Sequence, residues 1–342
     1  MSAPSSSIIP ASHSLLDAKA LGLLVERSFE IGAVRDCRLW RSFLNDVFRV
    51  QVGNQSWWLR VHPIDWRTRE QTQIEVDAVT ALRQDGAAVA AAISGRSGNR
   101  LLTIEAPEGI RTAVLFEDAA GLELDYFGPD GLRNATRYGR ATAELHDACD
   151  RITMDQAYES IDLASTVLRP CELVAAYLNQ SDRDDLERIC ARMIDHIDQY
   201  EALTSAFCHG DLNGSNIHFD LEAATVFDFD CCGWGWRTFE LAAFARGVTW
   251  YGGPGATTQS LCKAFLEGYR SRRPLTDEDL ALQPTMLLAQ RLWVTALHLK
   301  SAVRLGSFYF GNDYAAKFVR WLRAWETTLS AAPRRIRLTT RR

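Results

Sequence analysis

The chain has 342 residues, of which 47% are hydrophobic and 24% are charged, and it carries a formal net charge of −5. This is the composition of an ordinary soluble globular protein with enough chain for two lobes. The acidic balance argues against a dedicated nucleic-acid binder, which usually has a basic domain, and no run of about 18 apolar residues exists to span a membrane. The eight cysteines form no CxxC pair, so they favour thiols in a reducing cytoplasm over a disulfide frame or a zinc site.

The chain is expected to begin with an arm, a helix and three strands. Residues 1–14 are rich in serine and contain no lysine or arginine, which predicts a flexible arm and not a secretory signal. Residues 15–29 carry leucines at helical spacing. Residues 37–40, 47–52 and 56–62 are strand-forming runs split by turn signals, and they predict an antiparallel meander.

The predicted elements become mostly helical from about residue 121. Before that point, a helix is expected over residues 65–84 and strands over residues 89–93, 100–104 and 112–116. Beyond it, apolar residues recur at helical spacing, and Thr276 with Asp279 three residues later predicts a capped helix start. The later helices are expected over residues 131–148, 173–178, 184–203, 276–305 and 313–329, before a locally basic tail at residues 331–342 that we expect to be a solvated terminus.

One stretch carries a recognisable chemistry. Asp211 follows a His-Gly pair, Asn216 comes five residues later, and Asp228 comes twelve residues after Asn216. The protein-kinase catalytic loop has an aspartate and an asparagine at the same spacing, followed by a metal-binding aspartate. Phosphoryl transfer needs a carboxylate that orients the acceptor hydroxyl and accepts its proton, and oxygen ligands for Mg²⁺. Asp211 is therefore the predicted catalytic base, and Asn216 and Asp228 are the predicted metal ligands.

A hairpin is expected to bring the second aspartate back to this loop. Residues 217–219 and 225–227 should pair and place Asp228 beside Asn216. Asp230 would point to the same side of the strand as Asp228, because side chains alternate with a period of two. There it would bind a second metal or hold the loop. Loop residues that only satisfy turns are the competing interpretation, which the combined spacing disfavours.

Two residues of the N-terminal part have a predicted role with the nucleotide. Arg60 lies in the third predicted strand and Glu75 in the helix that follows. Kinases hold the α- and β-phosphates with a strand cation paired to a helix glutamate, and an arginine can bind a phosphate through two hydrogen bonds. Alone, the pair would be interpreted as a surface strand residue and a solvated helix charge, but the catalytic stretch reverses this preference.

Three further residues are candidates for nucleotide contacts. Phe116 and Asp118 end the last N-terminal strand, where backbone groups of a hinge could bind an adenine edge. The turn at residues 42–47 would cover the phosphates, but it contains no glycine. Any contact there would come from Asn45 or from backbone amides.

The chain resembles the aminoglycoside phosphotransferase family. His209-Gly210-Asp211-Leu212 with Asn216 resembles the family's HGDLHxxN signature, and Asp228 resembles its metal aspartate. Residues 58–61 and 138–146 resemble the "yvLRv" strand and the "lGraxAxLH" helix of one branch. The likeness runs from about residue 30 to residue 325. That branch includes homoserine kinase of the second type and the bacterial stress-response Ser/Thr kinase.

The resemblance implies an α+β, protein-kinase-like two-lobe fold with ATP and Mg²⁺ in the cleft. An N-lobe of an antiparallel sheet plus a helix, at residues 15–118, would bind the nucleotide. A mostly helical C-lobe, at residues 119–330, would hold the catalytic residues and the acceptor. The chain departs from the family pattern at Arg60, where lysine is usual, at Asn213, where relatives often have histidine, and at Glu240, which replaces the aspartate of a DLA motif.

Three functions follow from these residues. A cytoplasmic kinase of a small-molecule hydroxyl acceptor, such as an amino alcohol, an amino acid or an antibiotic, is preferred over a protein Ser/Thr kinase of the stress-response type. A nucleotide-binding pseudokinase is a further alternative, which the complete set of Asp211, Asn216 and Asp228 disfavours. The expected acceptor helices carry few acids, so they favour an acceptor with apolar or anionic parts over a polycationic aminoglycoside. Their basic residues, most of which should lie on solvated faces, are Arg246, Arg270, Arg272, Arg273, Arg291, Lys300 and Arg304.

Overall fold

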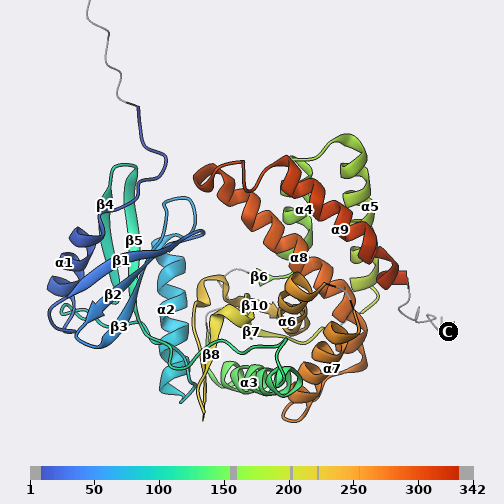
Figure 1. The fold of residues 1–342 in the computed structure, drawn as a ribbon, viewed down its shortest axis with the longest axis horizontal. Helices are drawn as coiled ribbons and strands as arrows, with labels where there is room; N and C mark the ends of the chain where they lie inside the picture. Colours follow the sequence, from blue (N-terminus) through green and yellow to red (C-terminus); the bar gives the residue numbers. More distant parts are fainter. Residues whose placement is uncertain (1–8, 155–159, 201–202, 222, 254, 331–342) are drawn as a thin grey trace, which may run out of the picture. The chain divides into compact units, whose positions relative to one another are not determined.

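The computed structural model of the chain contains two compact units (Figure 1). The first comprises residues up to Thr80 together with Ala90–Asp118, and the second comprises Ala81–Val89 and the residues from Ala119 onward. No helix in the described part of the chain is both long and apolar enough to cross a membrane. The first eight residues of the predicted arm and the whole basic tail lie outside the described residues, which are 9–154, 160–200, 203–221, 223–253 and 255–330.

The first unit is built on one antiparallel sheet. Its strands follow the order β1-β2-β3-β5-β4, so the predicted meander of the first three strands is confirmed. The sheet packs Phe48, Val50 and Leu59 in a core with residues of the first helix, including Val25. The elements of this unit are α1 (Ala18–Ser28), β1 (Asp36–Ser42), β2 (Asp46–Val52), β3 (Gln55–Val61), β4 (Leu101–Ala106) and β5 (Gly109–Glu117).

The strand predicted over residues 89–93 is not formed. This segment runs beside β5 but bonds to it only at separated points, from Ile93 N to Leu115 O at 2.8 Å and from Glu117 N to Ala91 O at 2.9 Å. Its central residues are alanines, which are poor strand formers because they bring little side chain to pack. The chain therefore connects the elements here without a continuous ladder.

Helix α2 (Arg69–Gln84) begins four residues later than the sequence predicts. Thr68 determines the start, because its hydroxyl accepts a hydrogen bond from Gln71 N at 3.2 Å. A threonine cap satisfies one of the N–H groups that the first helical turn leaves without a partner. Glu75 lies inside the helix, where only 1% of it is exposed.

The second unit is mostly helical, as predicted. Helix α8 starts with the predicted capping box, in which Thr276 Oγ1 accepts from Asp279 N at 3.0 Å and Asp279 Oδ2 accepts from Thr276 N at 3.1 Å. Its helices are α3 (Gly131–Arg151), the π-helical turn η1 (Ala164–Leu168), α4 (Arg169–Ala175), α5 (Gln180–Ile197), α6 (Arg237–Gly252), α7 (Ala256–Arg270), α8 (Asp277–Leu305) and α9 (Asn312–Ser330).

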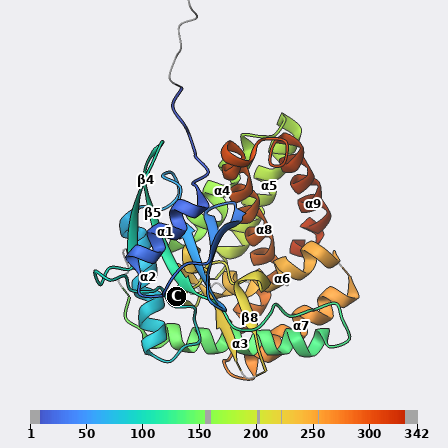
Figure 2. The ribbon, with the colours of Figure 1, turned by 60° about the vertical axis from the view of Figure 1, so that its left-hand side comes forward.

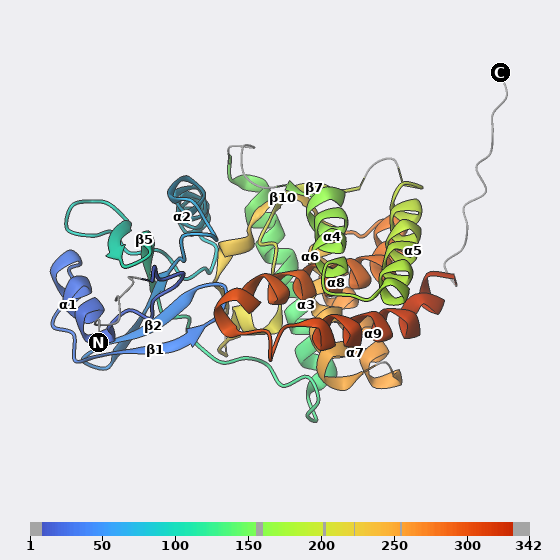
Figure 3. The same ribbon diagram turned by 90° about the horizontal axis from the view of Figure 1, so that it is seen from above.

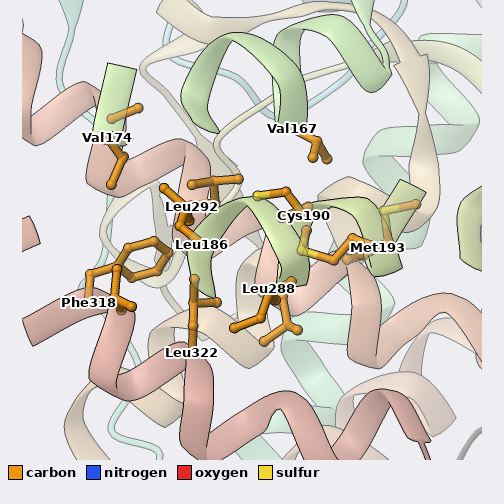
Figure 4. Packing of buried hydrophobic residues seen from close by; sticks show 14 of the residues in the cluster. Val167, Val174, Leu186, Cys190, Met193, Leu288, Leu292, Phe318 and Leu322 are labelled. Carbon is orange, nitrogen blue, oxygen red and sulfur yellow. The ribbon is translucent and has the colours of Figure 1, made fainter. Parts of the chain in front are cut away.

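Helix α8 lies at the centre of an apolar core of the second unit. Figure 3 shows α4, α5 and α9 gathered around it, and Figure 4 shows Leu288 and Leu292 of α8 among side chains from these helices. A helix that buries side chains on several faces has no single apolar stripe. This explains why α8 is apolar over most of its length. Burial of each large side chain contributes about 1.5–3 kcal/mol to stability.

Helices α3 and α7 approach each other closely through glycines (Figure 2). A Cβ atom on Gly139 would lie 1.9 Å from the carbonyl oxygen of Phe265, and one on Gly268 would lie 2.0 Å from that of Thr136. Any side chain at either position would force the two helices apart. Glycine is therefore required where these two backbones meet.

Short strands in the second unit support the loops that carry the predicted catalytic residues. β6 (Ser160–Ile161), β10 (Gly233–Trp236) and β7 (Ser205–Cys208) form a small sheet in that order. β8 (Ile217–Phe219) and β9 (Ala224–Val226) form the predicted hairpin, with Ile217 opposite Val226.

Candidate active site

A glycine turn presents Asp211 at the end of β7. Gly210 has a φ of +85°, a backbone conformation that residues other than glycine rarely adopt. A Cβ atom there would lie 1.9 Å from the carbonyl oxygen of Cys231. The chain therefore makes a tight turn at this glycine. The turn directs the chain away from β7 so that Asp211 follows immediately on the loop.

His209 fastens this loop to the chain that precedes Asp228. Its Nε2 donates to the carbonyl oxygen of Phe227 at 2.8 Å, and its Nδ1 accepts from Asp211 N at 3.2 Å. The side chain is fully buried and its ring lies 4.4 Å from that of Phe229. His209 thus has a bond at each nitrogen, and its role is to hold two loops together.

Asp211 is oriented by a partner that the sequence did not suggest. Its Oδ1 accepts a hydrogen bond from Arg246 Nη2 of α6 at 2.6 Å. Arg246 is in turn held by Gln290 Oε1, which accepts from its Nη1 at 3.0 Å. The carboxylate keeps 25% of its surface exposed. Its Oδ2, with a contact of 3.5 Å to Asn216 Nδ2, is the oxygen left for a hydroxyl group.

Asn216 is fixed so that its amide oxygen can face a cation. Its Nδ2 donates to the carbonyl oxygen of Asp211 at 2.9 Å, which turns Oδ1 the other way. Asn213 helps to set this geometry, because its Oδ1 accepts from Ser215 N at 2.9 Å and closes the turn η2 (Gly214–Asn216). At the position where relatives often have histidine, this chain uses an asparagine cap.

Asp228 has a strained backbone. Its φ of 64° and ψ of 57° are left-handed, and it is the one residue other than glycine with positive φ in the described part of the chain. Such conformations cost about 1–3 kcal/mol and cluster at functional sites. Phe227 N donates to Asn216 O at 3.0 Å, so the residue before Asp228 is bonded to Asn216 as the predicted hairpin requires.

The reasoning that put Asp230 on one strand face with Asp228 is wrong. Strand β9 ends at Val226, Asp228 turns the chain, and Asp230 lies in the short helical turn η3 (Phe229–Cys231). The two-residue alternation of a strand therefore does not apply. Asp230 is 4% exposed, and its role at a metal stays a prediction.

Glu240 of α6 holds the loop that carries Asp211 through hydrogen bonds. Its Oε1 accepts from Gly210 N at 2.7 Å, and its Oε2 accepts from His146 Nε2 at 2.6 Å. His146 Nδ1 accepts from the hydroxyl of Tyr269 at 2.8 Å. With Cys208, Glu240 and His146 lie close enough to hold a metal, but hydrogen bonds already use both Glu240 oxygens and both His146 nitrogens. We therefore interpret these residues as a structural hydrogen-bond network, in which Glu240 occupies the position of the aspartate in the DLA motif.

The protonation of this pair follows from its burial. Burial lowers the pKa of His146 below its usual range, against the opposing effect of Glu240. Burial alone would raise the pKa of Glu240, but the His146 hydrogen bond and nearby His209 outweigh it and hold that pKa low. His146 is thus neutral with its proton on Nε2, and Glu240 is charged.

We expect His146 to make the fold sensitive to mild acid. The unfolded chain protonates this histidine below about pH 6.5 while the folded protein does not, so stability falls with decreasing pH by about 1.4 kcal/mol per unit. His146→Gln should flatten that slope between pH 5 and 6.5 in urea unfolding followed by circular dichroism. His196 and His298 contribute equally in both proteins, so an unchanged slope would exclude His146 as the cause.

In the first unit, the predicted pairing of Arg60 with Glu75 is present. Arg60 Nη2 donates to Glu75 Oε2 at 2.5 Å, and both residues are buried. The guanidinium also lies 4.8 Å from the ring centroid of Phe116. The solvated interpretation of the two charges is thereby excluded, and their contact with phosphates stays a prediction.

The other nucleotide-contact candidates lie at two places in the first unit. Asn45 is 6% exposed in the turn between β1 and β2, where its carbonyl oxygen accepts from Phe43 N at 3.0 Å. Phe116 lies opposite Trp58 in the sheet. The carboxylate of Asp118 accepts from Trp58 Nε1 at 2.6 Å, so its side chain already has a partner. Binding at these positions is not tested and stays a prediction.

Sequence reasoning missed Arg246. We expected most arginines of the acceptor helices on solvated faces, as Arg270 is, but Arg246 is 6% exposed. One signal was present, because Arg246 interrupts a run of α6 that is otherwise apolar on all sides. A charge inside such a helix is usually paired.

Known proteins resemble this chain in sequence and in fold. The sequence model described as "Phosphotransferase enzyme family" matches residues 37–275. A protein of Deinococcus radiodurans is 32% identical over 321 residues, which cover 93% of this chain and 92% of the relative.

Two solved structures are similar in fold. The microcompartment-associated aminopropanol kinase has a TM-score of 0.72 and 22% identity, over 92% of this chain and 98% of that one. An amicoumacin kinase in complex with AMP-PNP and Ca²⁺ has a TM-score of 0.75 and 20% identity, over 92% and 94%. The predicted α+β, kinase-like fold class is confirmed.

Proposed function

The chain belongs to the phosphotransferase enzyme family, and from this membership we propose that it transfers the γ-phosphate of ATP to a hydroxyl of a small molecule. The predicted enzyme class, a phosphotransferase with an alcohol acceptor, is confirmed by the family. One observation supports the proposal most: Asp211 is partly exposed, oriented by Arg246, and adjacent to an Asn216 whose amide oxygen points away from the Asp211 carbonyl.

Asp211 would act on the acceptor. Arg246 holds Oδ1, so Oδ2 accepts the hydrogen bond of the acceptor hydroxyl and points its oxygen at the phosphorus. Phosphoryl transfer has a loose transition state, so orientation matters more than removal of the proton. The proton passes to Oδ2 as the new P–O bond forms and the bond between the γ-phosphorus and the bridging oxygen breaks, which releases ADP.

Mg²⁺ fits the donor set that lies beside Asp211. The Asn216 amide oxygen and the Asp228 carboxylate are oxygen donors, which this ion prefers, and Asp230 is a further candidate. The amicoumacin kinase was solved with AMP-PNP and Ca²⁺, which supports a nucleotide and a divalent cation for this chain as well. When bound, the ion neutralises charge on the phosphates. Arg60, oriented by Glu75, would hold the α- and β-phosphates.

The two parts of the chain would divide these tasks. We assign nucleotide binding to residues 15–118, where Arg60 and Glu75 lie, with Asn45, Phe116 and Asp118 as further contacts. Catalysis and acceptor binding belong to residues 119–330. The names of the similar structures, an aminopropanol kinase and an amicoumacin kinase, favour a small-molecule acceptor over a protein hydroxyl.

Purified protein with γ-labelled ATP and Mg²⁺ tests this function. The acceptor panel contains amino alcohols, hydroxy amino acids, aminoglycosides, macrolides and a generic protein. We expect label on a small molecule. Label on protein alone would select a Ser/Thr kinase, and no binding of Mg-ATP by calorimetry would exclude phosphoryl transfer from ATP.

Asp228→Asn should raise the Mg²⁺ concentration that gives half-maximal turnover. Asparagine tolerates the left-handed backbone, so the change removes charge without adding strain. We expect this concentration to rise at least about tenfold. Loss of a residue that only contacts a metal ligand already lowers metal affinity by about 10- to 100-fold. Asp277→Asn, at an exposed position of α8, is the matched control. An unchanged Mg²⁺ titration of Asp228→Asn would remove this residue from the metal site.

A further inference from the structure

Arg291 of α8 is held between two tryptophans. Its guanidinium carbon lies 3.9 Å from the ring centroid of Trp250 in α6 and 4.5 Å from that of Trp321 in α9. Stacking on an aromatic face stabilises a guanidinium by about 0.5–2 kcal/mol. The two rings fix the plane of the guanidinium, so its hydrogen-bonding edge is oriented in advance.

Within the described part of the chain, no carboxylate is paired with this cation. Its Nε and Nη1 are closed off from solvent and have no hydrogen-bond acceptor among the residues that the structure describes. The third nitrogen, Nη2, is not enclosed in this way. Burial lowers the pKa of Arg291 to about 10, so the group stays charged at neutral pH. An uncompensated buried charge is costly, and groups perturbed in this way cluster at functional sites.

The surroundings of Arg291 leave an excess positive charge near Asp211. Arg246 is a second cation, close enough to lower the pKa of Arg291 further, and Asp211 neutralises only Arg246. His298 carries no charge at neutral pH, because burial and then these two arginines lower its pKa to about 4. Tyr314 also stays neutral, because burial raises its pKa to about 12. One arginine therefore remains for a ligand.

We propose that Arg291 binds the carboxylate of the acceptor, so that the substrate is a small hydroxy acid or hydroxy amino acid. This inference rests on the proposed function, because it takes Asp211 as the residue that meets the hydroxyl. Arg246 lies between the two ends, bonded to Asp211 and influencing Arg291. The substrate would place its hydroxyl at Asp211 Oδ2 and its carboxylate at Arg291 Nη2. Carboxylate and guanidinium form strong charge-assisted hydrogen bonds.

Binding without turnover tests the inference separately from the reaction. Calorimetry compares L-2-aminobutyrate and 3-phenylpropionate, which have no hydroxyl to phosphorylate, with their amides, which lack the carboxylate charge. We expect each acid to bind wild-type protein about 10- to 100-fold more tightly than its amide, and Arg291→Gln to abolish the difference. Propyl phosphate, in place of the acids, shows whether the site selects a phosphate ester. Arg320→Gln, which removes an exposed charge next to Trp321, is the matched control.

A thermal melt distinguishes binding from a structural role. Because no ion pair is broken, Arg291→Gln should have a Tm equal to or above that of wild type. A lower Tm with unchanged acid binding would make Arg291 a packing residue and overturn the inference. So would failure of both acids to bind, or tighter binding of propyl phosphate than of either acid.

The reaction itself gives the second arm. L-Homoserine and 3-amino-1-propanol differ only in the carboxylate, as do L-serine and ethanolamine. We expect Arg291→Gln to raise KM for the acids about 10- to 100-fold and to leave KM for the amines unchanged. If no compound is phosphorylated but the acids still bind through Arg291, anion recognition stands and the proposed function fails. Preferential turnover of the amines would overturn the inference and leave the proposed function intact.

Discussion

An Asp211→Asn variant is expected to lose about 10²- to 10⁴-fold in kcat, the range that a positioned proton acceptor supplies. Asparagine keeps an oxygen that can accept from Arg246 Nη2, so the loop and the buried arginine retain their contact. The variant loses the carboxylate that orients the acceptor hydroxyl and takes its proton. Steady-state kinetics with saturating Mg-ATP measures the loss, and calorimetry should show unchanged affinity for the nucleotide.

A comparison of Asp211→Asn with Asp211→Ala separates the role of the carboxylate in orienting the acceptor hydroxyl from its role in stabilising the fold. Alanine leaves Arg246, which is 6% exposed, without its anion, so this variant should also unfold at lower temperature. Asp195→Asn, at an exposed position of α5 in the same unit, serves as the control for loss of one carboxylate and should keep full activity. Turnover that survives Asp211→Asn would assign the hydroxyl to another residue.

The sequence predicted the parts of this site that are local. The spacing of Asp211 and Asn216 requires one turn, and Gly210 makes that turn possible, so their contact follows from neighbouring residues alone. The hairpin that returns Asp228 spans only a few residues and carries its own turn signal. Arg60 and Glu75 also lie on consecutive elements, where a strand and the next helix meet predictably.

The parts that the sequence did not predict depend on pairings between distant segments. Arg246 reaches Asp211 across 35 residues, and Glu240 reaches His146 across 94. Neither pair leaves a periodic pattern, because a polar side chain inside an apolar helix looks the same whichever partner it has. The predicted placement of Asp230 on the same strand face as Asp228 was wrong for a different reason. A single left-handed residue, Asp228, ends the alternation on which its placement depended.

Glu240→Ala is expected to lower the free energy of unfolding by about 2–6 kcal/mol, because it leaves two buried donors, Gly210 N–H and His146 Nε2–H, without an acceptor at about 1–3 kcal/mol each. That is a large fraction of the 5–15 kcal/mol typical of a folded protein. The variant also releases Gly210, so the turn before Asp211 is no longer held. Urea unfolding followed by circular dichroism measures the stability, and kcat reports the loop.

Two milder substitutions at the same position decide whether the carboxylate or its length matters. In Glu240→Gln the amide oxygen can still accept from Gly210 N, and His146 can move its proton to Nδ1 and accept from the amide, so stability and kcat should largely recover. Glu240→Asp has the family's residue but is one methylene shorter, so it should keep one of the two bonds and recover only partly. If Glu240→Asp matched wild type in both measurements, the bridge between Gly210 and His146 would not be what holds the loop. If Glu240→Gln were as damaged as Glu240→Ala, the negative charge itself, and not the two hydrogen bonds, would support the site.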